Sequence, residues 1–218
     1  MQQILPCLYR FTGLWLGCAY LIEDPDGLTL VDAGLESAAP KIARQLGARL
    51  QQVRRILVTH PHSDHIGALP RLHELTGAPV WAGGPDRAVI EGREPTAAFR
   101  GQRLLPGTPV ARDLADGEVL PEVMGGLHVL ATPGHTPGQL CFWQPDRRVL
   151  FCGDLIMRFP LLGLRAPFAS ATLDMAANWR GVRRVAALKP AVVCFGHGPA
   201  LARGAAEALA AFAARAPG

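Results

Sequence analysis

The sequence has no long uninterrupted apolar run and no closely spaced pair of cysteines, and each absence excludes a class of protein. The apolar stretch from Phe11 to Ile22 is interrupted by glycines and followed at once by Glu23 and Asp24. It is too short to span a membrane and lacks the basic flank of a signal peptide. The five cysteines are far apart and none belongs to a CxxC pair, which argues against a disulfide framework or a thiolate zinc site. We expect a cytoplasmic protein with reduced thiols and no membrane partner.

Concentrated positive charge is also lacking. The 218 residues include 22 basic side chains, nearly all arginine, and 18 acidic ones, which gives a formal net charge of +4. The arginines form only short pairs, such as Arg54 and Arg55, so we expect no nucleic-acid partner. The 49% apolar content is ample for a continuous core, and the length fits one large domain over residues 1–218.

Strand-like and helix-like patterns alternate along the chain. Strands are predicted at residues 28–31, 53–58, 79–82, 119–120, 127–130, 140–143, 149–152 and 191–195. Helices are predicted at residues 37–50, 69–77, 173–188 and 199–214, and residues 92–110 are predicted to form a loop. Two strand-rich halves, each accompanied by helices, favour two sheets packed together with helices outside.

Three imidazoles and one carboxylate follow the apolar run that ends at Val58. His60 and His62 lie two apart, so an extended backbone would aim both toward one side, whereas the adjacent Asp64 and His65 point in different directions. Imidazole and carboxylate suit zinc, and to some extent iron or manganese. This stretch therefore predicts a metal site. A solvated histidine-rich loop after a strand is the non-functional alternative.

Three further strand ends carry a polar residue beside glycine. They are the stretches around His135 (residues 132–138), Asp154 (residues 151–154) and His197 (residues 195–198). Glycine and proline allow sharp turns and close backbone approach, as expected where strand ends converge on one cleft. Each stretch alone is a weak signal. Together with the first motif they supply five histidines and two aspartates, enough for two metal ions.

Two such ions would define a type of chemistry. Three histidines can hold one ion and leave a position open for water, while the other residues hold the second ion and one carboxylate bridges the two. Paired ions can share a hydroxide, lower its pKa, and stabilise the oxyanion formed when it attacks an acyl or phosphoryl centre. This is the chemistry of a hydrolase.

The motifs LVDAG, THPHSDHIG, TPGHTPGQ, FCGD and FGHG, in this order over nearly the whole chain, resemble those of the metallo-β-lactamase superfamily. The resemblance implies an α/β (α+β) fold, a four-layer αββα sandwich of two mixed β-sheets with helices on both outer faces. It implies two divalent ions, with zinc expected first and iron or manganese as alternatives. It assigns His60, His62 and His135 to the first ion, Asp64, His65 and His197 to the second, a bridging and catalytic role to Asp154, a catalytic role also to Asp64, and the orientation of a ligand to Asp32.

Features of the superfamily's branches narrow the reaction. True β-lactamases of this fold lack the bridging aspartate, so Asp154 argues against a β-lactam substrate. Glyoxalase II enzymes share the first motifs but carry a C-terminal helical region that binds glutathione, whereas only about twenty residues follow His197 here. The nuclease branches usually add a large insert, which has no room in this chain. Lactonase-like members often place a tyrosine after the bridging aspartate, but only Tyr9 and Tyr20 are present.

We therefore expect a lactonase-like or glyoxalase II-like enzyme, in which a hydroxide that bridges two metal ions attacks a small ester, lactone or thioester. The alternatives are a mononuclear iron enzyme like the persulfide dioxygenases, a phosphodiesterase with the same site, and a non-catalytic binding domain. His73 and His128 are expected to be structural.

The apolar segment of residues 155–169 directly follows the bridging aspartate. It could form a substrate wall with guanidinium groups for an anionic or carbonyl-bearing small molecule. An ordinary connection that packs on the core or at a homodimer contact is an equal alternative. The candidate wall residues are Arg158, Phe159, Leu161, Arg165 and Phe168.

Overall fold

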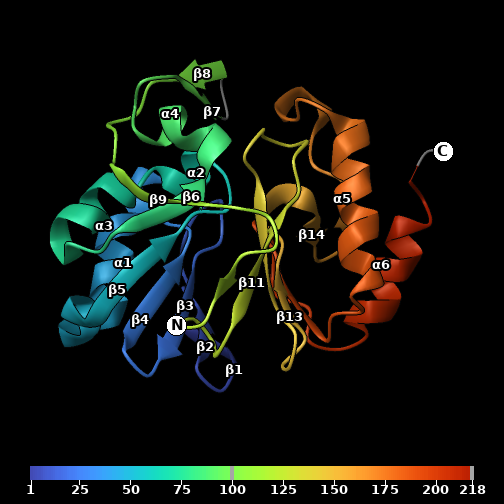
Figure 1. The fold of residues 1–218 in the computed structure, drawn as a ribbon, viewed down its shortest axis with the longest axis horizontal. Helices are drawn as coiled ribbons and strands as arrows, with labels where there is room; N and C mark the ends of the chain where they lie inside the picture. Colours follow the sequence, from blue (N-terminus) through green and yellow to red (C-terminus); the bar gives the residue numbers. More distant parts are fainter. Residues whose placement is uncertain (99–100, 217–218) are drawn as a thin grey trace.

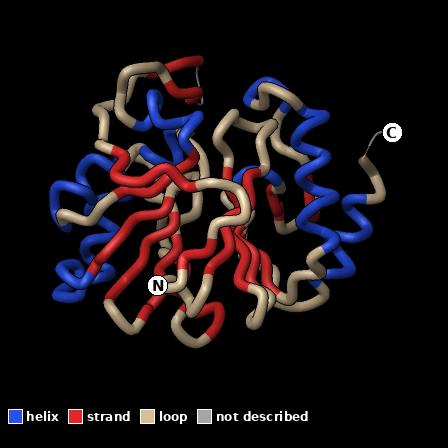
Figure 2. The backbone as a smooth tube through the Cα atoms, in the orientation of Figure 1, coloured by secondary structure: helices blue, strands red, loops and turns tan. Residues whose placement is uncertain are grey.

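The computed structural model describes residues 1–98 and 101–216, and two β-sheets lie face to face at its centre (Figures 1 and 2). The first sheet is mixed, with antiparallel pairing from β1 to β4 and parallel pairing from β4 onward. In spatial order its strands are β1 (Gln2–Leu5), β2 (Leu8–Arg10), β3 (Tyr20–Asp24), β4 (Gly27–Val31), β5 (Val53–Leu57), β6 (Val80–Gly83) and β9 (Val110–Leu114).

The second sheet is antiparallel except for its last pair, which is parallel. In spatial order its strands are β10 (Val119–Leu120), β11 (Leu127–Ala131), β12 (Leu140–Gln144), β13 (Val149–Phe151) and β16 (Val192–Cys194). Helices α1 (Ala39–Leu46) and α3 (Leu69–Thr76) cover the first sheet, and α5 (Met175–Ala187) and α6 (Ala205–Ala213) cover the second (Figure 1). The predicted four-layer αββα sandwich is confirmed.

Each central strand is buried on both faces. In β4, Leu30 packs toward α1 and α3 while Val31 packs between the sheets. In β12, Cys141 packs toward α5 and α6 while Phe142 packs between the sheets. Because successive side chains of a strand point to opposite faces, a strand inside a four-layer sandwich must be almost continuously apolar. Burial of each large apolar side chain contributes about 1.5–3 kcal/mol.

Two segments without a clear sequence pattern contain strands. The prediction of a loop over residues 92–110 is wrong in part, because β7 (Thr96–Ala98) pairs with β8 (Gly101–Arg103). After η4 (Gly153–Leu155), β14 (Met157–Phe159) and β15 (Gly163–Arg165) form a second hairpin. Both hairpins have strands of three residues, too short to show an alternating pattern.

Two predicted helices are shorter in the structure. Gly47, with φ +57°, ends α1, and η2 (Gly47–Gln52) follows it. The last helix begins at Ala205 instead of near residue 199, after a left-handed Gly204. Within the described parts of the chain, no helix combines the length and the apolarity that crossing a membrane requires.

Candidate metal centre

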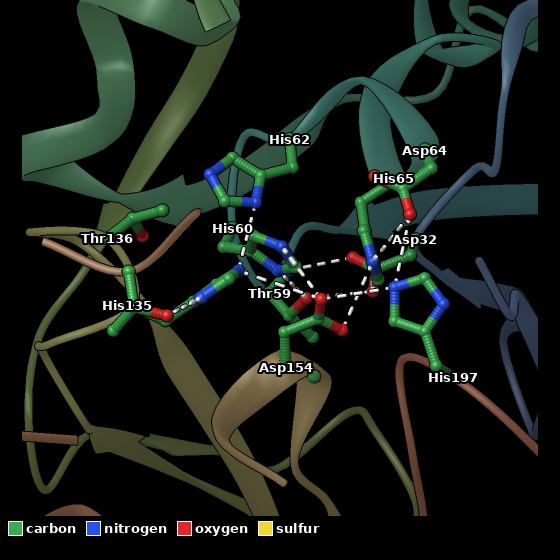
Figure 3. A network of polar contacts seen from close by, with 12 residues as sticks. Asp32, Thr59, His60, His62, Asp64, His65, His135, Thr136, Asp154 and His197 are labelled. Atoms are coloured by element: carbon green, nitrogen blue, oxygen red, sulfur yellow. Dashed lines mark hydrogen bonds and ion pairs between the residues drawn. The ribbon is translucent and has the colours of Figure 1, made fainter. Parts of the chain in front are cut away.

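The candidate centre lies where strand ends of both sheets meet. In the first sheet, β4 ends just before Asp32, and its parallel neighbour β5 ends shortly before His60. In the second sheet, β13 ends shortly before Asp154, and its parallel neighbour β16 ends shortly before His197. The loop that carries His135 joins β11 to β12. Since the carboxyl ends of parallel neighbours lie at the same edge of a sheet, these loops converge (Figure 3).

All seven predicted ligating side chains come together. They form two groups, and within each group one potential ligand atom per residue lies within 4.8 Å of the others. The first group is His60, His62, His135 and Asp154, and the second group is Asp64, His65 and His197.

Asp154 lies between the two groups. Its Oδ2 is 3.6 Å from His135 Nε2 in the first group and 3.1 Å from His197 Nε2 in the second. Its Oδ1 is 3.3 Å from His65 Nε2. A carboxylate in this position is able to contact both ions of a binuclear site. The structure is therefore compatible with the bridging role expected from the sequence.

Glycine is required beside this carboxylate. A Cβ at Gly196 would lie 2.0 Å from Asp154 Oδ1 and 2.8 Å from a ring carbon of His65. No side chain fits there without moving the site. This contact explains the glycine that precedes His197 in the sequence.

Asp32 forms hydrogen bonds with two residues of the first histidine motif, Thr59 and His65. Its Oδ1 accepts a 2.8 Å hydrogen bond from the Thr59 amide, and its Oδ2 accepts one of 2.8 Å from the Thr59 hydroxyl. His65 Nδ1 lies 2.9 Å from the same Oδ2 and donates to it, because a carboxylate only accepts. This bond turns His65 Nε2 toward the second group (Figure 3). The geometry is that expected of a carboxylate that orients a ligating histidine.

Sequence reasoning missed two threonines that contact the candidate ligands. The Thr59 hydroxyl lies 3.0 Å from His60 Nδ1, and the Thr172 hydroxyl lies 3.0 Å from His135 Nδ1. Thr59 precedes His60 in the motif, so a search for hydroxyls beside the histidines would have found it. Thr172 is 37 residues from His135 and belongs to no motif.

Several buried polar atoms in the cluster have no hydrogen-bond partner. They include His60 Nε2, His65 Nε2 and Asp154 Oδ1. Buried polar atoms are rarely left unsatisfied, since desolvation without a replacement partner is costly. Divalent ions would satisfy all three atoms, and imidazole and carboxylate suit such ions. The cluster is thus compatible with a binuclear metal site.

The histidines of the first group are neutral. Burial lowers the pKa of His60 and His62, and it lowers the pKa of His135 to about 3. A neutral imidazole has a free lone pair for a metal ion. His135 Nε2 and His62 Nδ1 lie 2.9 Å apart. This distance is shorter than the roughly 3.3 Å that separates two nitrogens on one tetrahedral zinc, for zinc–nitrogen distances near 2.0–2.1 Å.

The histidines of the second group have the opposite shift. Burial opposes a charge on His197, but Asp154 and Asp64 outweigh it and raise the pKa of His197 to about 9. Burial likewise opposes a charge on His65, and the neighbouring carboxylates raise its pKa well above the usual value. For Asp154, burial favours the neutral acid, yet His65 and His197 hold its pKa well below the usual range.

The candidate wall residue Arg158 contacts the loop that carries His197. Its backbone amide donates to the His197 carbonyl at 3.0 Å, and its guanidinium donates to the carbonyls of Pro199 and Ala200 at 3.0 and 2.7 Å. These bonds hold the loop that carries His197. A substrate contact of Arg158 stays a prediction, as it does for the other wall residues, which range from half-buried to fully exposed: Phe159, Leu161, Arg165 and Phe168.

Both tyrosine hydroxyls donate to groups outside the cluster. Tyr20 is buried and its hydroxyl donates to the Phe195 carbonyl at 2.7 Å, while the Tyr9 hydroxyl donates to Glu23 at 3.4 Å.

His73 Nδ1 donates to the Ala78 carbonyl at 2.8 Å, which ties the end of α3 to the following turn. Its contact is structural, as expected.

An αββα sandwich with a histidine and aspartate cluster at the strand ends defines a class of metal-binding proteins. A sequence profile of the metallo-β-lactamase superfamily matches residues 12–197, which contain all seven candidate ligands. The chain therefore belongs to the metallo-β-lactamase superfamily.

Individual relatives agree with this assignment. A hydroxyacylglutathione hydrolase from Rhodobacter capsulatus is 33% identical over 195 residues, which cover 88% of this chain and 64% of that protein. A crystal structure of a metallo-β-lactamase family protein from Thermus thermophilus, TTHA1429, superposes with a TM-score of 0.76 at 26% identity, covering 97% of this chain and 80% of that one. The structure of TTHA1623 in a di-iron-bound form superposes with a TM-score of 0.69 at 29% identity, covering 88% and 92%.

Proposed function

We propose that this protein is a binuclear metal-dependent hydrolase that cleaves a small ester, lactone or thioester. The observation that carries the proposal is Asp154 between two groups of ligating atoms, where His60 Nε2 is buried without a hydrogen bond and the buried His65 Nε2 and Asp154 Oδ1 contact each other only as an ion pair of 3.3 Å. When bound, two divalent ions would lower the pKa of a water molecule and stabilise developing negative charge on a carbonyl oxygen.

The ligating residues would bind the two ions and leave the centre accessible to substrate. The first group would hold one ion and the second group the other, with Asp154 shared between them. The side chains of His60 and Asp154 are 0% and 3% exposed, whereas those of His197 and Asp64 are 16% and 20% exposed. Asp64 and His197 are thus accessible, as is the partly buried His62, and substrate and water would reach the centre past these side chains. Asp64 is the more accessible carboxylate and could accept a proton there.

The substrate class is supported by the relative from Rhodobacter capsulatus, whose name describes hydrolysis of an acyl derivative of glutathione. This chain spans only 64% of that relative, so we propose the type of bond and not the glutathione carrier. Zinc is our first choice of metal, because imidazole and carboxylate with an open position suit it. Iron is the second, because TTHA1623 was solved in a di-iron-bound form.

The test begins with the metal content of the purified protein. We expect two ions per chain, and chelator-sensitive hydrolysis in a panel of lactones, thioesters, phosphodiesters and β-lactams. Activity that survives complete metal removal would contradict the mechanism. Hydrolysis of phosphodiesters alone would support the phosphodiesterase alternative, and one iron per chain with oxygen uptake would support the dioxygenase alternative.

A further inference from the structure

His135 is held by a hydroxyl from a distant segment. Its Nδ1 lies 3.0 Å from Thr172 Oγ1, and the same hydroxyl donates a 2.9 Å hydrogen bond to the Phe168 carbonyl. Thr172 directly follows η5 (Ala169–Ala171) and is half-buried.

These two contacts determine which nitrogen of His135 has the proton. A hydroxyl has one hydrogen, and a carbonyl oxygen can only accept. Since Thr172 donates its hydrogen to the Phe168 carbonyl, it must accept from His135, so the proton is on His135 Nδ1. The lone pair of His135 is then on Nε2, which lies 2.9 Å from His62 Nδ1 and 3.6 Å from Asp154 Oδ2.

The same logic applies to two other histidines of the cluster. The Thr59 hydroxyl donates to Asp32 and therefore accepts from His60 Nδ1, which leaves His60 Nε2 free. His65 Nδ1 donates directly to Asp32, so its Nε2 is the nitrogen that faces the second group. These contacts come from the first sheet, whereas the contact to His135 comes from the segment before α5.

The backbone on the C-terminal side of Thr172 is docked on the His135 loop. The Leu173 amide donates to the His135 carbonyl at 3.4 Å, and the Asp174 amide donates to the Gly134 carbonyl at 2.9 Å. The loop in turn fits closely against α5, because a Cβ at Gly134 would lie 2.3 Å from the Asn178 amide nitrogen. The hydroxyl of Thr172 is thus held at a defined position relative to the ring.

We propose that Thr172 is a positioning residue for the first group. Its hydroxyl selects the Nδ1–H tautomer of His135 and fixes the ring so that Nε2 faces a metal ion. The inference rests on the proposed metal binding. It adds a residue from the 168–174 segment to the machinery of the site, and partners of this kind typically change metal affinity by about 10–100-fold.

The test compares Thr172→Val, which has nearly the same shape and cannot accept a hydrogen bond, with Thr172→Ser, which keeps the hydroxyl. Zn²⁺ or Co²⁺ is titrated into metal-free protein against a competing chelator. We expect Thr172→Val to lower the affinity of one of the two ions by about 10–100-fold, and Thr172→Ser to stay within about threefold of the original protein. Nitrogen-15 NMR of the metal-free protein should show the Nδ1–H tautomer of His135 in the original protein and in Thr172→Ser, and its loss in Thr172→Val.

Three results separate the possible failures. If the original protein binds fewer than two ions, the proposed function fails and this inference fails with it. If it binds two ions and Thr172→Val binds both with unchanged affinity, only the inference is overturned. If Thr172→Val does not fold, Thr172→Ala takes its place, and unchanged affinity in that variant overturns the inference equally.

Discussion

The two groups of ligating side chains contain the same residue types, but their histidines differ in burial and in pKa. In the first group, the side chains of His60 and His135 are 0% and 1% exposed, and burial keeps them neutral. In the second group, His197 is partly exposed and has a pKa of about 9. His65 is fully buried, yet Asp32, Asp154 and Asp64 lie within 2.9, 3.3 and 3.9 Å of its ring nitrogens and raise its pKa.

The two groups therefore differ in the charge that their histidines have when no metal ion is bound. Protons on His65 and His197 offset the negative charge of Asp64 and Asp154 when no ion is bound. The first group has neutral imidazoles, and its satisfaction depends on an ion. Metal binding should therefore fill the first group directly, whereas it must displace protons from the second.

Removal of Asp154 should have the largest effect, because this carboxylate contacts both groups. We expect Asp154→Ala to lose both ions and to lower turnover by at least about 10³-fold. In the metal-free protein it should also lower stability, because His65 and His197 lose a carboxylate that favours their protonated forms. Metal analysis, hydrolysis assays and thermal unfolding measure these effects. Asp146→Ala, at an exposed carboxylate in the turn before β13, is the matched control and should change none of them.

Replacement of one histidine in each group tests whether the groups act separately. His135→Ala should remove the ion of the first group and retain the other, and His197→Ala should do the reverse. Each variant should bind about one ion per chain, and its turnover should fall by about 10²-fold or more. Metal titration with a competing chelator gives both stoichiometries. If either variant loses both ions, the two groups form one inseparable site and are not prepared independently.

Asp32→Asn should have a smaller effect and should act mainly on the second group. The amide oxygen can still accept from the Thr59 backbone, but the amide NH2 group then replaces Oδ2 and cannot accept from His65 Nδ1. We expect the affinity of the second group to fall by about 10–100-fold, and the first group to change less because Thr59 lies between Asp32 and His60. Equal losses in both groups would show that Asp32 acts on the whole motif.

The parts of this site that were predictable have a local chemical signal. His60, His62, Asp64 and His65 are recognisable because ligands cluster within one short stretch after a strand. The single residues His135, Asp154 and His197 are recognisable because each follows a strand and lies beside glycine. The sheets were predictable for a related reason, since strands buried on both faces are almost uninterruptedly apolar.

The missed parts depend on contacts that no local pattern encodes. Thr172 is an ordinary threonine until the fold brings it to His135. The bonds from Arg158 to the Pro199 and Ala200 carbonyls likewise depend on a distance that cannot be read from a sequence. The β7 and β14 hairpins escaped prediction because three-residue strands show too little periodicity.

A pH dependence of metal binding, which needs no substitution of its own, tests the contrast between the two groups most directly. Below about pH 9, His197 of the metal-free protein is protonated, so an ion that binds its Nε2 must displace that proton. Raising the pH removes the competing proton, so the affinity of the second group should rise with pH by up to about tenfold per unit for each proton displaced, and this gain from His197 should end near pH 9. The affinity of the first group should stay level from pH 7 to 9, because the pKa of His135 is about 3. Calorimetric titration in buffers of different ionisation enthalpy counts the released protons, with His135→Ala and His197→Ala isolating each group. A level affinity in both groups, or the same slope in both, would mean that burial and neighbouring carboxylates do not prepare the two groups differently.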